Sequence, residues 1–192
     1  MKIQEKKMKR KTAKELLADS FRELAETKAI DKITIKDITD NCGYSSATFY
    51  RQFQDKYDLI AWAYTRDLEG ILDRIVFDED SCRQVLMDAA TYYSEHRKYL
   101  SNLFLHTSGY DSFVRNMTEI HYASLTKQVL KSAGTTKLDE KTDMLIRGYV
   151  FSTVTLSCEW ILGRYEADAQ TLAEVYEISL PAPLKAYLTG TK

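Results

Sequence analysis

The sequence has few residues that interrupt helices. It contains only 7 Gly and 2 Pro among 192 residues, and the prolines, Pro181 and Pro183, stand together near the C-terminus. This scarcity favours long helices over a fold of short strands joined by turns. The length suffices for one or two domains with a real core. The hydrophobic fraction of 44% and the charged fraction of 29% are ordinary for a globular protein.

Cysteine pairs and long apolar runs are also missing. The 3 cysteines are widely spaced, odd in number and without a CxxC pair, so a reduced, cytoplasmic setting is expected rather than a disulfide framework or a zinc site. The N-terminus, MKIQEKKMKRK, has no apolar stretch of the kind found in signal peptides. The most apolar segment, residues 149–162, includes Glu159 and is too short to span a bilayer, so no membrane partner is expected.

Motifs of common enzyme sites are not found. The chain has no GxGxxG, P-loop, HExxH or GxSxG motif. The histidines His96, His106 and His121 lie too far apart in sequence for metal-ligand spacing. We therefore expect no catalytic residue, no metal and no cofactor, and a protein that is not an enzyme.

Charge is unevenly distributed, although the net charge is only −1. Residues 1–56 hold 13 Lys and Arg against 9 Asp and Glu, whereas the remainder holds 14 against 19. The first 14 residues alone hold 7 basic residues and 1 acidic residue. A basic arm of this kind attracts polyanions such as DNA. Taken alone, it is at least as typical of a solvated tail.

Hydrophobic spacing predicts a small helical head at the N-terminus. Residues 13–25 carry apolar side chains at helical intervals, with Thr12 placed to cap the helix. Thr34 stands before a second apolar stripe, and Asp37 three residues later completes a capping box. Gly43 is expected to end that second helix.

The next segment, SSATFYRQF, has a composition unlike that of a core helix. Phe49 and Phe53 lie four residues apart and share one face, which leaves hydroxyl groups, a tyrosine ring and a cation pointing outward. Ser45 is expected to cap this third helix, which finishes near Phe53, and Asp55 to cap a long fourth helix over residues 56–76. The second and third helices, with the first packed across them, predict a helix-turn-helix unit.

This head resembles TetR-type bacterial transcription regulators. The resemblance covers residues 9–69 and rests on ITIKDITDNCGYSSATFYRQFQDKYDLI, which combines a Thr-led helix, a Gly-x-Ser turn, a Thr-aromatic-Tyr-x-x-Phe run and a final Lys-x-acidic-Leu. Tyr44 departs from the pattern, which more often has a small aliphatic residue there. The resemblance implies an all-α fold, with an N-terminal three-helix helix-turn-helix head at residues 9–69. A long helix would join it to an all-helical effector-binding and dimerisation body at residues 70–192.

The resemblance also assigns polar residues of the head to DNA. The expected DNA-binding residues are Thr34, Lys36, Ser45, Ser46, Thr48, Tyr50, Arg51, Gln52 and Lys56. In the major groove, Gln52 can pair with adenine and Tyr50 can contact a thymine methyl group, although Tyr50 also fits packing against the first helix. Thr34, Ser45 and Lys56 are expected at phosphates, which position the protein without reading bases. Each polar position taken singly also fits a solvated surface.

The rest of the chain is expected to be helical. Apolar spacing predicts helices at residues 81–95, 97–107, 110–133, 139–165 and 168–188, the last bent or broken at its prolines. The segment 149–162 is apolar on nearly every side, which predicts burial on all sides and a partner for the face turned away from its own domain. The resemblance implies that the last two long helices pair with their copies in a homodimer. A twofold dimer would read a palindromic operator in double-stranded DNA.

Aromatic residues are frequent in the body, which fits either an ordinary core or a cavity for a small, largely apolar molecule. The candidate ligand-binding residues are Trp62, His106, His121, Tyr122, Tyr149 and Glu159. A buried Glu159 would need a partner, either a cationic effector or an internal ion pair. The sequence thus predicts a DNA-binding transcriptional regulator, a repressor that a small-molecule effector releases from DNA. The alternative is an activator, or a regulator controlled by a protein partner.

Overall fold

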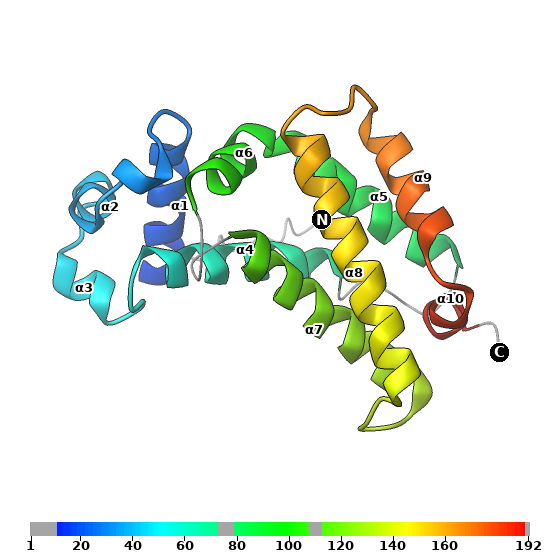
Figure 1. Cartoon of the computed structure of the whole chain (residues 1–192). Helices are drawn as coiled ribbons and strands as arrows, with labels where there is room; N and C mark the ends of the chain where they lie inside the picture. Colours follow the sequence, from blue (N-terminus) through cyan, green and yellow to red (C-terminus); the bar gives the residue numbers. More distant parts are fainter. Residues whose placement is uncertain (1–10, 73–78, 108–112, 191–192) are drawn as a thin grey trace, which may run out of the picture. The chain divides into compact units, whose positions relative to one another are not determined.

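The computed structural model describes residues 11–72, 79–107 and 113–190, and all regular secondary structure in these ranges is helical (Figure 1). The chain divides into two compact units between Ala63 and Tyr64. The basic arm expected to attract DNA lies largely outside the described residues. No helix in the described ranges has the length and apolar content needed to cross a membrane.

The first unit, which we call the head, contains the predicted helix-turn-helix. Its elements are α1 (Ala13–Ala25), the 3₁₀ helix η1 (Ile30–Lys32), α2 (Ile35–Cys42), α3 (Ser46–Tyr50) and the first turns of α4 (Lys56–Leu72). Helix α1 packs against both α2 and α3. The buried side chains that hold the head together include Leu17, Phe21, Ile30, Ile38, Phe49 and Phe53. This core accounts for a stable head because burying each large apolar side chain contributes about 1.5–3 kcal/mol.

The sequence signals for helix ends in the head are confirmed. Thr12 and Thr34 each form a full capping box, with Glu15 and Asp37 respectively. Gly43 ends α2 in the left-handed conformation, with φ of 73°, which glycine adopts without the steric cost of a Cβ atom. These local signals were readable because a cap depends on residues only three positions apart.

Helix α4 begins where the sequence predicted. The Asp55 carboxylate accepts hydrogen bonds from the backbone N–H groups of Tyr57 (2.8 Å) and Asp58 (2.9 Å). Helix α3 ends at Tyr50, three residues before the predicted end, and Phe53 lies in the connection to α4. Phe53 is nevertheless buried, with its ring centroid 5.7 Å from that of Phe49.

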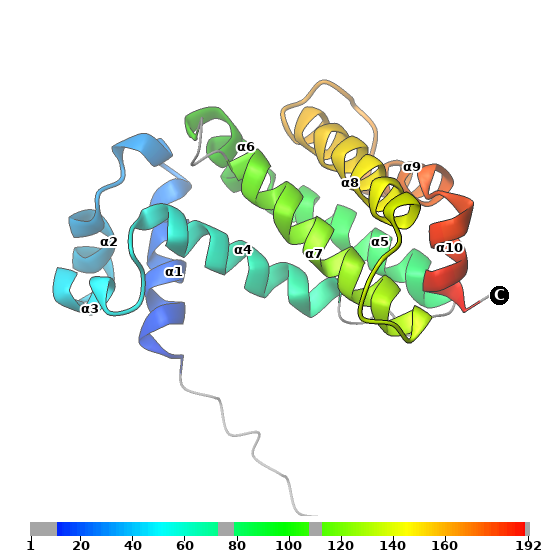
Figure 2. The ribbon, with the colours of Figure 1, turned by 60° about the horizontal axis from the view of Figure 1, so that its bottom comes forward.

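The second unit, which we call the body, contains, within the residues that the structure describes, the rest of α4 and six further helices. These are α5 (Glu79–Glu95), α6 (Arg97–His106), α7 (Phe113–Ala133), α8 (Glu140–Ile161), α9 (Ala169–Ser179) and α10 (Ala182–Thr189). Helix α5 packs against α9, α7 packs against α8, and α10 packs against both α5 and α7. Figure 2 shows α10 beside α5, with α6 at the other end of the body. This packing leaves an interior enclosed by five helices.

The C-terminal region departs from the sequence prediction in two ways. The helix predicted over residues 168–188 is two helices, and Pro181 stands at the start of the second, as expected from its missing N–H donor. The segment 149–162 has two different faces within the chain. Val150 and Val154 are buried, whereas Phe151 is 69% exposed. The outward face of α8 therefore carries large apolar side chains, Met144 and Phe151, that the single chain leaves uncovered, among polar ones such as Arg147.

Candidate functional site

Helix α3 presents polar side chains because its apolar anchors face inward. Phe49 is wholly buried, and its ring lies edge-on to Tyr50 at a centroid distance of 5.7 Å. Tyr50 itself is 60% exposed. Ser46 and Gln52 are exposed as well. The residues expected to read bases therefore lie at the surface of the head, with Ser46 and Tyr50 on α3 and Gln52 in the turn after it, over a buried phenylalanine core.

The start of α3 is stabilised by two hydroxyl groups. The Ser45 hydroxyl accepts a hydrogen bond from the Thr48 backbone N–H at 3.2 Å, and the two side-chain oxygens lie 3.1 Å apart. Ser45 is exposed and Thr48 is half-buried. Of the two, Ser45 is the better placed to meet a phosphate, because Thr48 is partly covered by its own turn.

At the start of α2, the Thr34 hydroxyl is already engaged within the chain. It donates to the Asp37 carboxylate at 2.8 Å and accepts from the Asp37 backbone N–H at 3.1 Å. Asp37 also accepts from Lys28 at 2.7 Å. Hydrogen bonds from Lys28 and then from Thr34 hold the pKa of Asp37 well below its usual range. Thr34 therefore acts as the cap of α2. Its hydroxyl oxygen keeps one lone pair that can accept a further hydrogen bond.

Two lysines of the expected DNA-binding set have different surroundings. Lys36 is exposed and pairs with Asp40 across one helical turn. Lys56, at the start of α4, is half-buried, and its ammonium donates to the carbonyl oxygens of Ile30 (2.9 Å) and Ile33 (3.0 Å). The carbonyl oxygen of Asp31 lies at 3.4 Å. Lys56 thus ties the end of η1 to α4.

Burial lowers the pKa of Lys56, and the nearby Asp31 charge opposes this shift only in part. The sequence predicted this lysine at a DNA phosphate and gave no hint of the carbonyl contacts. They join residues more than twenty positions apart in sequence, which no local pattern encodes. In the folded head, the Lys56 ammonium has a structural function. A DNA phosphate would have to bind the same ammonium group that these carbonyl oxygens already contact.

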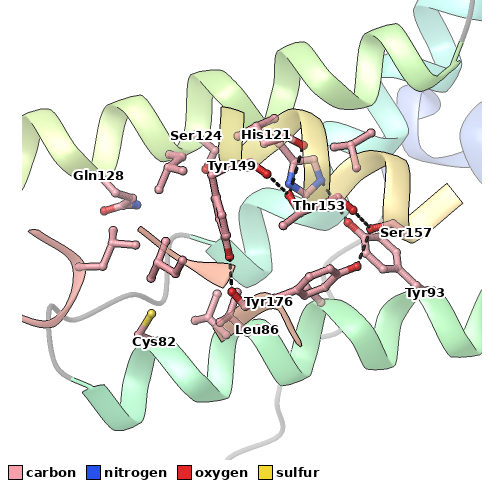
Figure 3. Close-up of a pocket in the computed structure, with 17 residues that line it drawn as sticks. Cys82, Leu86, Tyr93, His121, Ser124, Gln128, Tyr149, Thr153, Ser157 and Tyr176 are labelled. Carbon is pink, nitrogen blue, oxygen red and sulfur yellow. Dashed lines mark hydrogen bonds between the residues drawn. The ribbon is translucent and has the colours of Figure 1, made fainter. Parts of the chain in front are cut away.

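In the body, side chains of five helices line a partly open cavity of about 80 Å³ (Figure 3). Residues of α5, α7, α8, α9 and α10 line it. Two of the candidate ligand residues, His121 and Tyr149, are among them. The other four candidates, Trp62, His106, Tyr122 and Glu159, do not line this cavity.

Trp62 belongs to the head, where its ring packs on Phe53 at 5.7 Å and lies under the Lys14 ammonium at 4.9 Å. His106 is exposed at the end of α6. Tyr122 donates a hydrogen bond to Asp143. None of these three residues lines the cavity. The sequence prediction thus placed in one ligand site residues that lie in different parts of the fold.

Glu159 lies outside the cavity and has partners within the chain. Its carboxylate forms an ion pair with Arg164 at 3.1 Å and accepts a hydrogen bond from the Tyr165 hydroxyl at 3.3 Å. The sequence left open whether Glu159 pairs with a cationic effector or with a residue of its own chain, and the structure shows the internal ion pair. A cationic ligand in the cavity would therefore lack this counter-charge.

One group of polar atoms beside the cavity is a triangle formed by Tyr64, Tyr93 and His121. The His121 Nε2 atom lies 3.0 Å from the Tyr64 hydroxyl and 3.1 Å from the Tyr93 hydroxyl, and the two hydroxyls are 3.3 Å apart. Desolvation lowers the pKa of His121 to about 4. Desolvation also raises the pKa values of both tyrosines well above their usual range. All three groups are therefore neutral at pH 7.

A second group of polar atoms links α8 to α9. The Tyr149 hydroxyl donates to the Tyr176 backbone carbonyl at 2.9 Å. The Ser157 hydroxyl lies 2.7 Å from the Thr153 carbonyl and 2.5 Å from the Tyr176 hydroxyl. A serine hydroxyl has one proton, so when Ser157 donates to Thr153, Tyr176 donates to Ser157. Sequence reasoning missed Ser157 and Tyr176, because helical spacing does not say which polar residue faces inward.

Comparison with known proteins agrees with this architecture. Residues 17–62 match the family model described as bacterial regulatory proteins, tetR family. No curated protein sequence matches the chain. Similar solved structures include the dihydroxyacetone kinase operon activator DhaS, with a TM-score of 0.63 at 18% identity, covering 90% of this chain and 96% of that one.

Two fatty-acid regulators share the fold at similar coverage. The fatty acid degradation regulator FadR from Bacillus halodurans has a TM-score of 0.63 at 15% identity, covering 91% of this chain and 98% of its own. FadR of Thermus thermophilus, a TetR-family repressor solved with lauroyl-CoA, has a TM-score of 0.61 at 14% identity, covering 93% and 95%. These proteins regulate transcription. The head thus matches the tetR family model over residues 17–62, and the chain shares the fold of these solved regulators over most of its length.

Proposed function

We propose that the head binds a specific operator by placing α3 in the major groove. The observation that carries this proposal is the exposure of Ser46 and Tyr50 on α3, which the buried Phe49 anchors, and of Gln52 in the turn directly after it. A Gln amide and a tyrosine ring on the outward face are suited to reading base edges and thymine methyl groups. Lys36 and Arg51, both exposed, are suited to phosphates.

Charge within the head adds to this proposal. Residues 11–56 hold 8 Lys and Arg and 8 Asp and Glu, so the positive excess of the N-terminal region comes from residues 1–10. We propose that this arm supplies sequence-independent attraction to phosphates. The α3 surface then supplies the discrimination between sequences. Since DNA is the partner, the protein is proposed to act in the cytoplasm.

We further propose that the regulator is a homodimer built on α8 and α9. Large apolar side chains are exposed on both helices, with Phe151 at 69% on α8 and Ile178 at 84% on α9. Met144, one heptad before Phe151, is 66% exposed on the same face. A second copy is the occupant that fits, because a twofold pairing of these faces buries all of them at once. The dimer then presents two heads to a palindromic operator.

The body is proposed to bind a small effector that releases the dimer from DNA. The cavity in the body supports this, and the Thermus thermophilus FadR structure holds lauroyl-CoA. Tyr64, which hydrogen-bonds to His121, lies on α4, and the same helix begins at Lys56 in the head. A ligand that binds one conformation of the body better can thus shift the population of DNA-competent dimers. We propose repression as the outcome, and activation, the mode named for DhaS, as the alternative.

Footprinting with purified protein on the DNA flanking its own gene tests the operator proposal. We expect a protected palindrome whose half-sites lie one helical turn apart, about 34–36 Å, or a multiple of that distance. A variant with both Gln52→Ala and Tyr50→Ala should lose the footprint and retain weak, salt-sensitive binding. Protection without twofold symmetry would contradict the dimer, and an unchanged footprint with the variant would contradict the assignment of α3 as the reading helix.

A further inference from the structure

We propose that the body cavity binds a neutral, largely apolar small molecule with one hydroxyl or carbonyl oxygen, and that it excludes carboxylates and ammonium compounds. The inference rests on the proposed function, in which the body binds an effector, and it names the chemical class of that effector. It is carried by three observations on the residues that line the cavity: their lack of charge, the placement of their polar atoms and the size of the enclosed space.

The first observation is that none of the described residues lining the cavity is acidic, and none is a lysine or an arginine. The lining combines aliphatic or small residues, such as Val85, Ala89 and Val150, with neutral polar ones, such as Tyr149 and Gln128. An ionised ligand brought into such a space would lose its hydration without gaining a counter-ion. That desolvation costs several kcal/mol or more unless the charge is paired.

The polar groups of the lining do not supply a hidden charge. Desolvation keeps His121 neutral at pH 7, with a pKa of about 4. Burial raises the pKa values of Tyr149 and Tyr176, so their hydroxyls remain protonated. Tyr93 behaves in the same way. The cavity therefore meets its ligand with neutral donors and acceptors only.

The second observation is the placement of those polar atoms. Figure 3 shows the side-chain polar atoms of Tyr93, His121, Ser157 and Tyr176 gathered toward one end of the cavity, with Cys82 and the neutral amide of Gln128 toward the other. Hydroxyl groups can reverse their donor and acceptor roles, so the first end can receive either an alcohol or a carbonyl. A neutral ligand with its oxygen at the hydroxyl-rich end matches this distribution.

The third observation limits size. The cavity of about 80 Å³ can hold water, but it is about half the volume, near 150 Å³, of an apolar cavity that accepts benzene. A ligand with a single ring that lies wholly within the cavity must therefore displace lining side chains or move the helices that carry them. Such a ligand binds the expanded body better than the closed one, which is the differential affinity that a shift in population requires.

A set of three probes of the same shape tests the charge selectivity. Benzyl alcohol, benzoate and benzylammonium are titrated into the full-length protein at neutral pH by isothermal titration calorimetry. We expect benzyl alcohol to bind and the two ions to bind at least about 100-fold more weakly. Equal binding of either ion overturns the proposal. Preferred binding of benzylammonium would instead assign the tyrosine faces to cation–π contacts.

Two variants place the binding in this cavity. Tyr176→Phe removes one hydroxyl from the polar end and should weaken benzyl alcohol about tenfold while leaving toluene unaffected. Tyr165→Phe is the matched control, because it removes a tyrosine hydroxyl that contacts Glu159 outside the cavity. Ala89→Leu should fill the space and abolish binding of both probes. Unchanged benzyl alcohol affinity in Tyr176→Phe overturns the site even if Ala89→Leu fails to fold.

A separate DNA measurement distinguishes failure of this inference from failure of the proposed function. Operator affinity is measured with and without saturating benzyl alcohol. Binding to the cavity with no effect on operator affinity supports the ligand class and contradicts effector control by this class of molecule. Operator binding with no detectable binding of benzyl alcohol or toluene leaves the regulator proposal intact and overturns the ligand class.

Discussion

Replacing Lys56 with methionine separates its two functions, a structural tie and a phosphate contact. The substitution keeps the length and much of the apolar stem of the side chain and removes the ammonium. In the folded head, the ammonium donates to the carbonyls of Ile30 and Ile33 at 2.9 and 3.0 Å. Loss of this donor leaves the end of η1 without its link to α4.

The size of the effect follows from the hydrogen bonds. A hydrogen bond that involves a charged group contributes about 1.5–3 kcal/mol. Because Lys56 is half-buried, water can replace part of the lost pairing, and the cost of desolvating the ammonium, seen in its lowered pKa, disappears. We expect a net loss of about 2–3 kcal/mol for the two short bonds together, and a decrease in Tm of roughly 5–10 °C.

The assay combines thermal unfolding with DNA binding at several salt concentrations. Lys36→Met is the matched control, because Lys36 is an exposed lysine expected at DNA and its Asp40 partner is also exposed. We expect Lys36→Met to keep the Tm and to lower the salt slope by about one unit per half-site. Lys56→Met should lower the Tm. Lys56→Arg should lower the Tm as well, because a planar guanidinium presents a different donor geometry. An unchanged Tm in Lys56→Met would refute the structural reasoning and restore the phosphate contact as its function.

Four further outcomes are expected. Phe151→Glu should dissociate the dimer in analytical ultracentrifugation without unfolding the chain, since this side chain is 69% exposed; a variant that stays dimeric excludes this face. Gln52→Ala should lose about 1–3 kcal/mol at particular base pairs of a single-substitution operator panel, whereas a uniform loss would indicate phosphate contact. Phe49→Ala should destabilise the head by about 3–5 kcal/mol in denaturant unfolding, and a smaller loss would mean that the site collapses around the cavity. The free energy of unfolding should fall by roughly 3 kcal/mol as the pH drops from about 6.5 to about 4, because His121 binds a proton in the unfolded chain more readily than in the folded one. The variant His121→Asn should lose this pH dependence, and a slope that persists in the variant would assign it to other groups.

The sequence was most informative where structure depends on near neighbours. Thr34 and Asp37 are three residues apart, and their capping box could be named from spacing alone. The same holds for Gly43 at the end of α2. The inward placement of Phe49 also followed from its helical relation to Phe53. Each of these features is determined within about one helical turn, so no knowledge of the tertiary fold was needed.

The cavity depends on distant residues, and sequence reasoning recovered only part of it. His121 and Tyr149 were selected as aromatic or titratable residues in an apolar region, and Trp62 was selected on the same grounds. Helical spacing gives the relative directions of side chains on one helix. It does not say which neighbouring helix each direction meets. Tyr176 reaches the cavity because α9 packs on α5, a contact between segments more than seventy residues apart.

Helix α8 shows the same limit within a single element. Its run of apolar residues predicted burial on every side, but the chain alone buries only one face. Val154, at 2% exposure, faces the interior and lines the cavity, whereas Phe151, three residues earlier, faces outward. A charge at Val154 would therefore damage the protomer and the cavity and would report little about dimerisation. The two faces of α8 therefore serve two separate proposals, effector binding on the inside and association with a second copy on the outside. Because one helix carries both faces, a ligand that shifts α8 through Val154 would also shift the surface proposed to meet the second copy.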